Sequence, residues 1–467
     1  MSEESVLLIY PPGHWGEIER FCQPLGILWL ASMLKEEGIK VKAIDLSAEG
    51  WGPNRLAKFI AQGDFTHVGT TILTPFRNLG YDVLKIAKKI DPSITTLAGG
   101  PHATYLKEKT FVECSAIDIV VSGEAELDIV DIVRNPTKKF YDLGVIQDID
   151  SLPIPDRSHI RHIQYNKMDS LWLGDTASMK WVRGCSWRKC SFCSRSELTM
   201  IHRRRSPEKI VEEIALLQNE MNYKNIIVVD DSLRIKSKYV KDIFHLKIKE
   251  GLDIPFWLMA RADHIDDEGA RLMRRAGGTG LLIGLESVVP RIIDMYRKTN
   301  ADPRTWYRKL DQAFELADKH QLITLVTLIV GAPTETEEEM WTTFDYSRHS
   351  KLDLIQPNPF IFLVGTDLWR DAAQKGQIQA DQYWTYNDKS YGTTRFTTEE
   401  LFDLAVQAQN HVNSPILNPK RGWRIIRKLI KQKNWQLIGQ NLIRLPLVFY
   451  DLFVEHPYEV VPEELHA

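Results

Sequence analysis

Cysteine is scarce in this sequence, and long apolar runs are absent. The chain has 467 residues but only five cysteines, too few for the disulfide framework of a secreted protein. No apolar run approaches the roughly 18 residues that a membrane-spanning helix needs. The first residues, Met-Ser-Glu-Glu-Ser, carry acid where a signal peptide carries base. We therefore expect a soluble, cytoplasmic protein.

A strong net charge is also lacking. The 59 Lys and Arg residues nearly balance the 62 Asp and Glu residues, giving a net charge of −3, which excludes a strongly basic nucleic-acid binder and an acidic disordered tail. This near balance conceals an uneven distribution of charge along the chain. Residues 404–450 hold eight basic and no acidic side chains, so 51 basic residues face all 62 acidic ones in the rest of the chain. The C-terminal part is therefore chemically distinct.

The first 135 residues alternate short β-branched runs with longer helical patterns. Helical patterns such as 25–37 and 81–90 separate five expected strands, at residues 6–10, 41–45, 67–71, 94–97 and 117–121. This alternation implies right-handed βαβ crossovers and a doubly wound parallel sheet of the α/β class, Rossmann-like, with ligands at the carboxyl ends of the strands. We assign residues 1–147 to this domain and residues 148–175 to a linker stiffened by prolines.

A second series of strands and helices follows the linker. Helical patterns such as 207–222 and 305–320 lie between six expected strands, at residues 179–183, 225–230, 256–260, 280–285, 323–330 and 354–357. Six β/α units indicate a partial (β/α)6 barrel with its chemistry at the carboxyl ends of the strands. We assign residues 176–392 to this domain and residues 393–467 to a small helical C-terminal region.

Three of the five cysteines fall within nine residues, with the spacing C-x4-C-x2-C. Cys185, Cys190 and Cys193 lie on the loop after the first expected barrel strand. Three thiolates from one loop can bind three irons of a [4Fe–4S] cluster and leave the fourth iron open to a ligand. The alternatives are a zinc knuckle and ordinary buried cysteines. A closed zinc site needs a fourth ligand, and His202 lies nine residues beyond Cys193 in a basic run, so we favour the cluster.

The cysteine segment resembles the radical S-adenosylmethionine (SAM) enzymes, and specifically their cobalamin-dependent class. The usual spacing of that superfamily is C-x3-C-x2-C, so this chain has one more residue between Cys185 and Cys190. The aromatic residue before the last cysteine, Phe192, matches the family. The resemblance implies that Phe192 lies near the adenine of SAM. Together with the first domain, it covers about four fifths of the chain.

Elements at the ends of the later strands support this resemblance. Gly284-Leu-Glu-Ser287 looks like the SAM-binding GxES element of the family, and Gly331-Ala-Pro-Thr-Glu335 is similar to the element after the fifth strand. The resemblance places Asp231 at the amino end of SAM, although it can also be a surface acid or a helix N-cap. Arg261 can fork onto the SAM carboxylate or pair with a nearby aspartate. The implied SAM contacts are Phe192, Asp231, Arg261, Gly284, Glu286, Ser287 and Gly331.

Glycine turns follow two expected strands of the first domain, in Ala98-Gly-Gly-Pro-His102 and Val121-Ser-Gly-Glu-Ala-Glu126. Glycine lets a backbone approach a bulky ligand closely, and each turn is also typical of any nucleotide-binding or flavin-binding fold. The combination looks like the cobalamin-binding domain of the same enzyme class. The D-x-H-x-x-G signature of a cobalt-ligating histidine is missing, with His14 the nearest candidate, and the resemblance implies residues 73–76 beneath the corrin. The implied contacts are Leu73, Thr74, Gly99, Gly100, Pro101, His102, Gly123 and Glu124, with His102 either at the nucleotide tail or capping a turn.

The resemblance implies three cofactors: a [4Fe–4S] cluster, SAM and cobalamin in its methyl form. The partners are a small-molecule or lipid-like substrate and an external electron donor of the flavodoxin or ferredoxin type, with no nucleic acid. Our leading hypothesis is methylation of an unactivated carbon through a 5′-deoxyadenosyl radical, with Cys185, Cys190 and Cys193 holding the cluster. Cyclases and rearrangement enzymes use the same parts, and a non-catalytic corrin or iron sensor is a third alternative.

The basic C-terminal part is predicted to form an amphipathic helix. Its apolar face is Ile425, Ile426, Leu429 and Ile430, its basic residues are Arg424, Arg427, Lys428 and Lys431, and Trp423 and Trp435 flank it. Such a helix can lie on an anionic membrane surface, or it can pack on the barrel with a solvated basic face. A membrane contact would favour a lipid or isoprenoid-type substrate.

Overall fold

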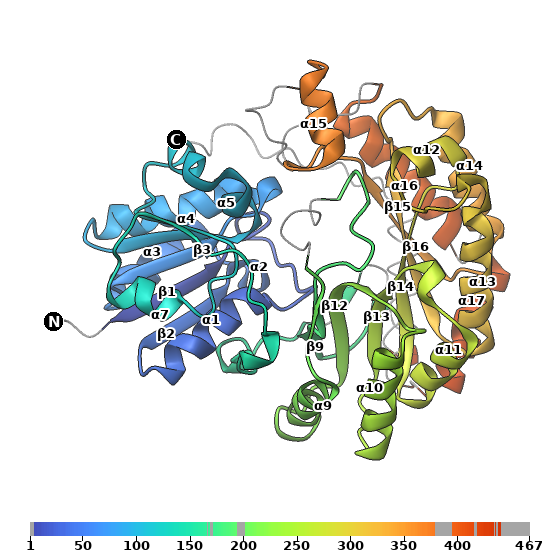
Figure 1. Ribbon diagram of the computed structural model, residues 1–467, viewed down its shortest axis with the longest axis horizontal. Helices are drawn as coiled ribbons and strands as arrows, with labels where there is room; N and C mark the ends of the chain where they lie inside the picture. The colour runs from blue at the N-terminus through green and yellow to red at the C-terminus, as the bar shows by residue number, and fades with distance from the viewer. Residues whose placement is uncertain are drawn as a thin grey trace.

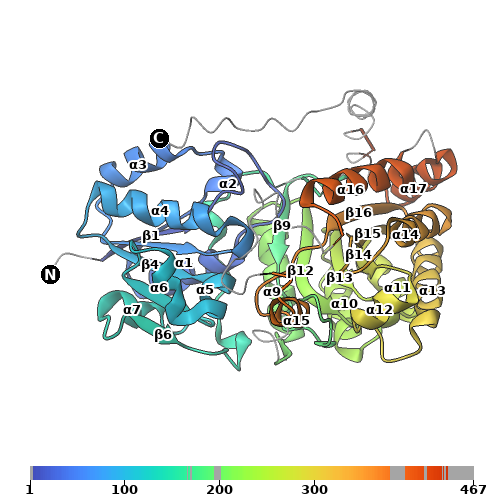
Figure 2. The ribbon, with the colours of Figure 1, turned by 90° about the horizontal axis from the view of Figure 1, so that it is seen from above.

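Two parallel sheets form the body of the protein and lie side by side (Figures 1 and 2). The computed structural model describes residues 4–165, 167–168, 171–193, 201–378, 395–414, 418–433, 435 and 438–439. Within these residues, no helix combines the length and apolarity needed to cross a membrane.

The first sheet has six parallel strands in the order β2-β1-β3-β4-β5-β6. The strands are β1 (Ser5–Tyr10), β2 (Lys40–Asp45), β3 (His67–Thr71), β4 (Thr95–Gly99), β5 (Ile119–Ser122) and β6 (Phe140–Asp142). The helices are α1 (Leu25–Glu36), α2 (Leu46–Glu49), α3 (Pro53–Gln62), α4 (Arg77–Ile90), α5 (Gly100–Leu106), α6 (Thr110–Glu113) and α7 (Ile129–Arg134). Helices α1 and α7 share one hydrophobic core with the sheet, while α3 and α4 share another. The predicted doubly wound sheet is thus confirmed, with β6 as a strand that the sequence did not indicate.

The second sheet also has six parallel strands, in the order β16-β15-β14-β13-β12-β9. They are β9 (Thr176–Met179), β12 (Asn225–Leu233), β13 (Phe256–Ala260), β14 (Gly278–Glu286), β15 (Ile323–Val330) and β16 (Leu354–Pro359). The surrounding helices are α9 (Pro207–Ala215), α10 (Lys238–Lys249), α11 (Asp267–Arg275), α12 (Pro290–Met295), α13 (Trp306–Lys319), α14 (Glu337–His349) and α15 (Asp367–Gln374), and α16 (Thr398–Asn413) and α17 (Pro419–Lys431) follow. The partial (β/α)6 barrel and the helical C-terminal region are therefore as predicted.

The first barrel strand is displaced from its predicted position. The sequence pattern favoured residues 179–183, but β9 ends at Met179. Val182 and Arg183 instead form a short strand, β10, which pairs antiparallel with β11 (Arg203–Arg204). The sequence pattern places the strand too late in the chain, because Thr176-Ala-Ser-Met is less apolar than the Trp181-Val182 pair that follows it. A further antiparallel pair, β7 (Lys167–Met168) and β8 (Leu171–Trp172), precedes β9.

Helix α17 closes the amino-terminal end of the barrel. Lys428 is fully buried, and its Nζ binds Asp353 Oδ2 at 2.7 Å and the Leu322 carbonyl at 2.9 Å. Arg424 also binds Asp353, at 2.9 Å. Leu429 packs among the inward-facing residues of the strands. Ile425 and Leu429 of the predicted apolar face therefore meet the barrel, whereas Ile430 of that face is 41% exposed. Part of the predicted basic face is bound to the barrel instead of being solvated.

Candidate functional site

The ribbon of β10 and β11 forms the base of the cysteine loop. Both ends of the loop start from this ribbon, with Arg183 paired to Arg203 across it. Two carboxylates at the end of β12 hold the ribbon backbone. Asp230 Oδ1 accepts from the Trp181 and Val182 amides at 2.9 and 3.1 Å. Burial raises the pKa of Asp230 to about 7.

The second carboxylate on β12 is the predicted SAM residue Asp231. Its Oδ2 accepts from the Gly184 amide at 3.1 Å, directly before Cys185. Its Oδ1 lies 3.8 Å from Lys180 Nζ. Asp231 therefore supports the cysteine loop, and its predicted contact with the amino end of SAM stays a prediction.

Three free thiols lie on the loop, and all three are partly exposed. Burial raises the pKa of Cys190 to about 11, and the Lys298 and Arg261 charges oppose this shift while Cys193 adds to it. Across the described ranges, no three histidine, cysteine or carboxylate side chains converge into a ready-made metal site. The donor set of three accessible thiols backed by two cations still suits an anionic iron–sulfur cluster. The three thiols therefore lie on one loop and are accessible, but they do not converge on a common point.

Arg261 and Trp187 form the inner support of the loop. Arg261 binds both oxygens of Asp263, at 3.0 and 3.1 Å, and the Lys298 carbonyl at 2.8 Å. Its guanidinium lies 4.2 Å from the centre of the Trp187 ring. The Trp187 amide donates to Cys185 Sγ at 3.4 Å. The ion pair between Arg261 and Asp263, one of the alternatives from the sequence, is present, and the SAM contact stays a prediction.

The GxES element surrounds a buried ion pair. Lys298 Nζ binds Glu286 Oε1 at 2.8 Å. A Cβ on Gly284 would lie 2.3 Å from Glu286 Oε1 and 2.9 Å from Lys298 Nζ, so a larger residue at this position would displace the ends of the paired side chains. Ser287 is fully buried, with its Oγ 3.2 Å from Thr343 Oγ1. The sequence did not indicate Lys298, since a lone lysine carries no motif of its own.

Phe192 and Gly331 are the remaining predicted SAM contacts. The Phe192 ring meets Tyr296 edge to face, with 4.7 Å between centroids. Gly331 has φ +79°, and its amide donates to Glu335 Oε2 at 3.1 Å. Burial raises the pKa of Glu335 to about 7. A Cβ on Gly331 would lie 2.2 Å from Leu401 of α16, so this turn also fits the C-terminal helix against the barrel.

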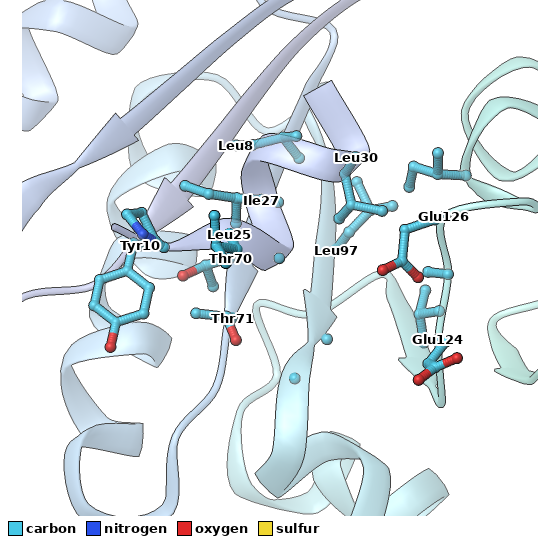
Figure 3. Close-up of a pocket in the computed structure, with 18 of the residues that line it drawn as sticks. Leu8, Tyr10, Leu25, Ile27, Leu30, Thr70, Thr71, Leu97, Glu124 and Glu126 are labelled. Carbon is cyan, nitrogen blue, oxygen red and sulfur yellow. The ribbon is translucent and has the colours of Figure 1, made fainter. Parts of the chain in front are cut away.

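A cavity of about 400 Å³ opens at the carboxyl edge of the first sheet (Figure 3). Its volume falls within the range of small-molecule sites. Figure 3 shows Tyr10 on one side of the cavity and Glu124 and Glu126 on the other. Its lining is mainly apolar and includes Leu8, Ile27, Leu30, Leu97, Val121 and the predicted residues Gly99, Gly100, Gly123 and Glu124. Apolar walls with exposed glycine backbone suit part of a corrin cofactor. We call this space the corrin cavity.

Two glycines in this lining have a steric reason to be glycine. Gly100 has φ +90°, and a Cβ there would lie 2.2 Å from Thr71 Oγ1. Gly123 has φ +93°, and a Cβ there would lie 2.4 Å from the Gly144 carbonyl. Both turns are therefore also needed by the fold, which is the alternative that the sequence left open. Pro101 follows Gly100 at the exposed start of α5.

His102 lies in a buried chain of polar groups behind the loop of residues 73–76. Its Nδ1 lies 3.0 Å from Thr74 Oγ1, and its Nε2 lies 3.1 Å from Glu113 Oε2. Tyr81 donates to the same Glu113 oxygen at 2.6 Å. His102 is fully buried, whereas Leu73 is partly exposed. His102 thus fixes the loop from behind, and its predicted contact with the nucleotide tail stays a prediction.

Four charged residues join the corrin cavity to the base of the cysteine loop. Arg183 binds Glu126 Oε1 at 2.6 Å and Glu124 Oε1 at 3.3 Å. Arg203 binds both oxygens of Glu124, at 2.5 and 2.9 Å. The Arg183 guanidinium also lies 4.7 Å from the centre of the Trp29 ring on α1. We call Arg183, Arg203, Glu124 and Glu126 the bridging ion cluster.

Gln23 makes a second connection between the sheets. Its backbone N–H donates to Ser178 Oγ at 2.9 Å, and its side-chain oxygen accepts from Arg157 Nε at 3.1 Å. Arg157 is itself fully buried against Glu213 of α9, at 2.6 Å. Gln23 also lines the cavity. Its contact with Ser178 of β9 therefore holds the backbone just before α1 against the second sheet. The sequence did not indicate the two contacts of Gln23, which join residues more than 100 positions apart.

Two family models match the chain, one for each sheet. The B12 binding domain model matches residues 15–133. The Radical SAM superfamily model matches residues 179–347. The first match covers the glycine turns of the cavity, and the second covers the cysteine loop and the GxES element. These matches imply that cobalamin binds in the first domain and that a [4Fe–4S] cluster and SAM bind in the second.

Relatives share both parts in one chain. An uncharacterized methyltransferase of Pyrococcus horikoshii is 32% identical over 87% of this chain and 92% of its own length. An anaerobic magnesium-protoporphyrin IX monomethyl ester cyclase of Rubrivivax gelatinosus is 26% identical over 80% of this chain and 71% of its own length.

The solved structure of the radical SAM methyltransferase TsrM from Kitasatospora setae, with cobalamin and a [4Fe–4S] cluster bound, has a similar fold. It matches with a TM-score of 0.63 at 16% identity, over 80% of this chain and 75% of that chain. The cobalamin-dependent radical enzyme OxsB matches with a TM-score of 0.59 at 17% identity, over 80% of this chain and 56% of its own. The cysteine loop, the corrin cavity, both family models and the relative from Pyrococcus horikoshii thus agree, and the chain belongs to the cobalamin-dependent radical SAM enzymes.

Proposed function

We propose that this protein is a radical C-methyltransferase that acts on an unactivated carbon of a small-molecule substrate. The bridging ion cluster is the observation that carries the proposal. Glu124 and Glu126 line the corrin cavity and also bind the two arginines at the base of the cysteine loop. The two cofactor sites thus share a boundary, and a reaction that draws on both cofactors at one carbon requires them to be held close together.

The cluster, when bound, supplies the electron that cleaves SAM to a 5′-deoxyadenosyl radical, and cobalamin supplies the methyl group. The three thiols would hold the cluster, with the ion pairs of Arg261 with Asp263 and of Lys298 with Glu286 behind the loop. Phe192, Asp231, Glu286 and Ser287 would orient SAM. The loop of residues 73–76, fixed from behind by His102, would support the corrin.

The relatives agree with methyl transfer. The relative from Pyrococcus horikoshii is named a methyltransferase, and a cytidylyl-2-hydroxyethylphosphonate methyltransferase of Streptomyces wedmorensis is 21% identical over 81% of this chain. The cyclase of Rubrivivax gelatinosus supports a second candidate, a cyclisation or rearrangement without methyl transfer. The two candidates differ in their products. A methyltransferase turns over SAM into both 5′-deoxyadenosine and S-adenosylhomocysteine, whereas a cyclase forms no S-adenosylhomocysteine.

Anaerobic turnover of SAM by the reconstituted protein tests the proposal. We expect both 5′-deoxyadenosine and S-adenosylhomocysteine from the wild type. We expect neither 5′-deoxyadenosine nor iron–sulfur absorbance from Cys185→Ala. Cys114→Ala is the matched control, because Cys114 lies in the core of the first domain, away from the loop. The formation of 5′-deoxyadenosine without S-adenosylhomocysteine would contradict methyl transfer. A non-catalytic corrin or iron sensor would instead release no 5′-deoxyadenosine and retain corrin binding in Cys185→Ala.

A peripheral membrane contact through α17 is a separate part of the proposal. Its outer side carries Trp423 at 65% exposure and Ile430 at 41%, and Trp435 follows at 64%. Lys420 and Lys431 are exposed beside them. Tryptophan and lysine together favour the interface of an anionic bilayer, which would make a lipid substrate accessible. The full chain should float with anionic liposomes, and Trp423→Ser/Trp435→Ser should not; a wild type that stays in the soluble fraction excludes the contact.

A further inference from the structure

The inner faces of the barrel strands change in character toward their carboxyl ends. Three leucines of adjacent strands form one inward layer and pack with α17: Leu282, Leu325 and Leu354. Side chains alternate between the two faces of a strand, so the next inward positions lie two residues later. These positions are Gly284, Thr327 and Gln356, which are paired in register. We call Gly284, Thr327 and Gln356 the inner row.

The exposed surface of the inner row lies inside the barrel. All three of its residues are partly exposed, whereas the leucines below them are buried. The residues between the two layers point outward and are completely buried under the helices: Ile283, Val326 and Ile355. The inner row is therefore accessible from the interior of the barrel, above a closed floor of leucine.

Two polar side chains lie together in the inner row. Thr327 and Gln356 are direct partners on the neighbouring strands β15 and β16. In the part of the chain that the structure describes, neither side chain has a hydrogen-bond partner. Threonine offers a hydroxyl, and glutamine offers a carbonyl oxygen and an N–H side by side. Ligand sites are mostly apolar with a few polar groups that fix the orientation of the ligand, and this pair has the properties of such groups.

The polar pair lies on the interior side of the predicted SAM site. Ile329, the next inward residue of β15, packs against the same hydrophobic cluster as Phe192, the predicted neighbour of the adenine. Thr327 lies one inward step deeper in the barrel, about 7 Å along the strand. Thr327 and Gln356 are therefore displaced from the adenine side of the barrel mouth toward its leucine floor.

The barrel interior also borders the corrin cavity. Cys22 lines that cavity and packs against the apolar cluster that contains the three leucines. Val229 of β12 packs both against this cluster and against the core of the first domain. The inner row thus faces a region bordered by both predicted cofactor sites, which is where a carbon that reacts with both cofactors has to be held.

The charged side chains at the ends of β13 and β14 are already paired. Arg261 binds Asp263 at 3.0 Å, and Glu286 binds Lys298 at 2.8 Å. A charged substrate group would compete with these bonds, whereas Thr327 and Gln356 have unused donors and acceptors. The described part of the barrel mouth therefore favours a neutral polar group.

We propose that Thr327 and Gln356 select the substrate by binding a neutral amide-type group, such as a carboxamide or a lactam. The Gln356 side chain would exchange two hydrogen bonds with the N–H and the carbonyl of this group, and the Thr327 hydroxyl would donate to the same carbonyl. A substrate without the group would leave Gln356 dehydrated and unpaired, which is how such a site discriminates. The inference rests on the proposed function, since it names the substrate class of the same site.

Ligand-detected NMR on the full chain, loaded with cluster, cobalamin and SAM but without a reductant, tests this inference. The probe is 2-piperidone, a six-membered lactam, and we expect it to bind with a Kd on the order of 1–10 mM. Cyclohexanone, which has the same ring without the N–H, and the anion cyclohexanecarboxylate should each bind at least about tenfold more weakly. Thr327→Val/Gln356→Met should remove this preference for the lactam. The control Thr342→Val/Gln407→Met makes the same changes at exposed positions on α14 and α16 and should keep it.

The affinity for SAM separates substrate selection from cofactor binding. We expect it to change by less than about twofold in Thr327→Val/Gln356→Met, because the pair lies deeper than the predicted SAM contacts. Three results would each overturn the inference: no binding of the lactam by the wild type, binding of the ketone or the anion as tight as that of the lactam, and a loss of SAM affinity equal to the loss of lactam affinity. The proposed function fails separately, when the reduced protein releases no S-adenosylhomocysteine, because lactam binding requires no turnover.

Discussion

Arg183→Met should loosen the connection between the two domains. Arg183 and Glu126 are only 8% and 6% exposed, so little water screens their 2.6 Å contact. The substitution removes the charge and leaves Glu126 buried without its partner, while Glu124 keeps Arg203. Removing one partner of a buried ion pair costs about 3–5 kcal/mol. Loss of the cation–π contact with Trp29 adds about 1 kcal/mol.

The expected total for Arg183→Met is therefore about 5 kcal/mol. At roughly 2–4 °C per kcal/mol for units of this size, the first unfolding transition should fall by about 10–20 °C. Arg183→Met/Glu126→Leu removes the unpaired carboxylate and should recover about half of this loss. Arg134→Met is the matched control, because the pair of Arg134 with Glu37 is exposed and is worth at most about 1 kcal/mol.

Scanning calorimetry of the four variants and the wild type, with Glu126→Leu included to complete a double-mutant cycle, measures this coupling. We also expect cobalamin affinity to fall in Arg183→Met, because Glu126 lines the cavity. Two results would refute the reasoning: an Arg183→Met melting profile equal to that of Arg134→Met, or single-variant losses that simply add in the double variant.

Three further predictions concern other parts of the chain. Lys428→Met should destabilise the barrel by about 2–4 kcal/mol in urea unfolding, because Asp353 stays buried with Arg424 as its remaining cation; an unchanged midpoint would contradict the role of α17 as a closure. Gly123→Ala should lower both stability and cobalamin affinity, measured by titration, since its Cβ would clash with a carbonyl. Glu335 has a folded-state pKa of about 7 against an ordinary 4.5, so its stabilising contribution is full below about pH 4.5 and falls by about 3 kcal/mol as the pH rises to 7; Glu335→Gln should lack this part of the pH dependence of unfolding.

The strands that the sequence predicted best are continuous apolar runs. β13 and β15 occur at their predicted bounds, because their apolar and β-branched residues are buried on both faces of a parallel sheet. β9 was displaced since its four residues include Thr176 and Ser178, whose pattern carries no apolar run. β6 was missed because a three-residue edge strand leaves too short a pattern to detect.

The cofactor sites were predictable only as far as local motifs extend. The three cysteines, the GxES element and the glycine turns are contiguous in sequence, so they could be recognised without a fold. The bridging ion cluster joins Arg183 to Glu126 across 57 positions, and no local pattern records such a pair. The structure was needed to separate the arginines that serve the interface from those that face solvent.

The place of α17 in the barrel has a consequence for biosynthesis. The last barrel strand ends at Pro359, but the helix that seals the floor of the barrel ends at Lys431, 72 residues later. At a synthesis rate of about 5–20 residues per second, the nascent barrel stays unsealed for roughly 4–15 seconds after its sheet is complete. During this time Asp353 and the strand side chains at the amino-terminal end of the barrel remain exposed to water. A ribosome that stalls in this interval would leave a chain with every cofactor motif translated and an open barrel, which makes it a substrate for chaperones.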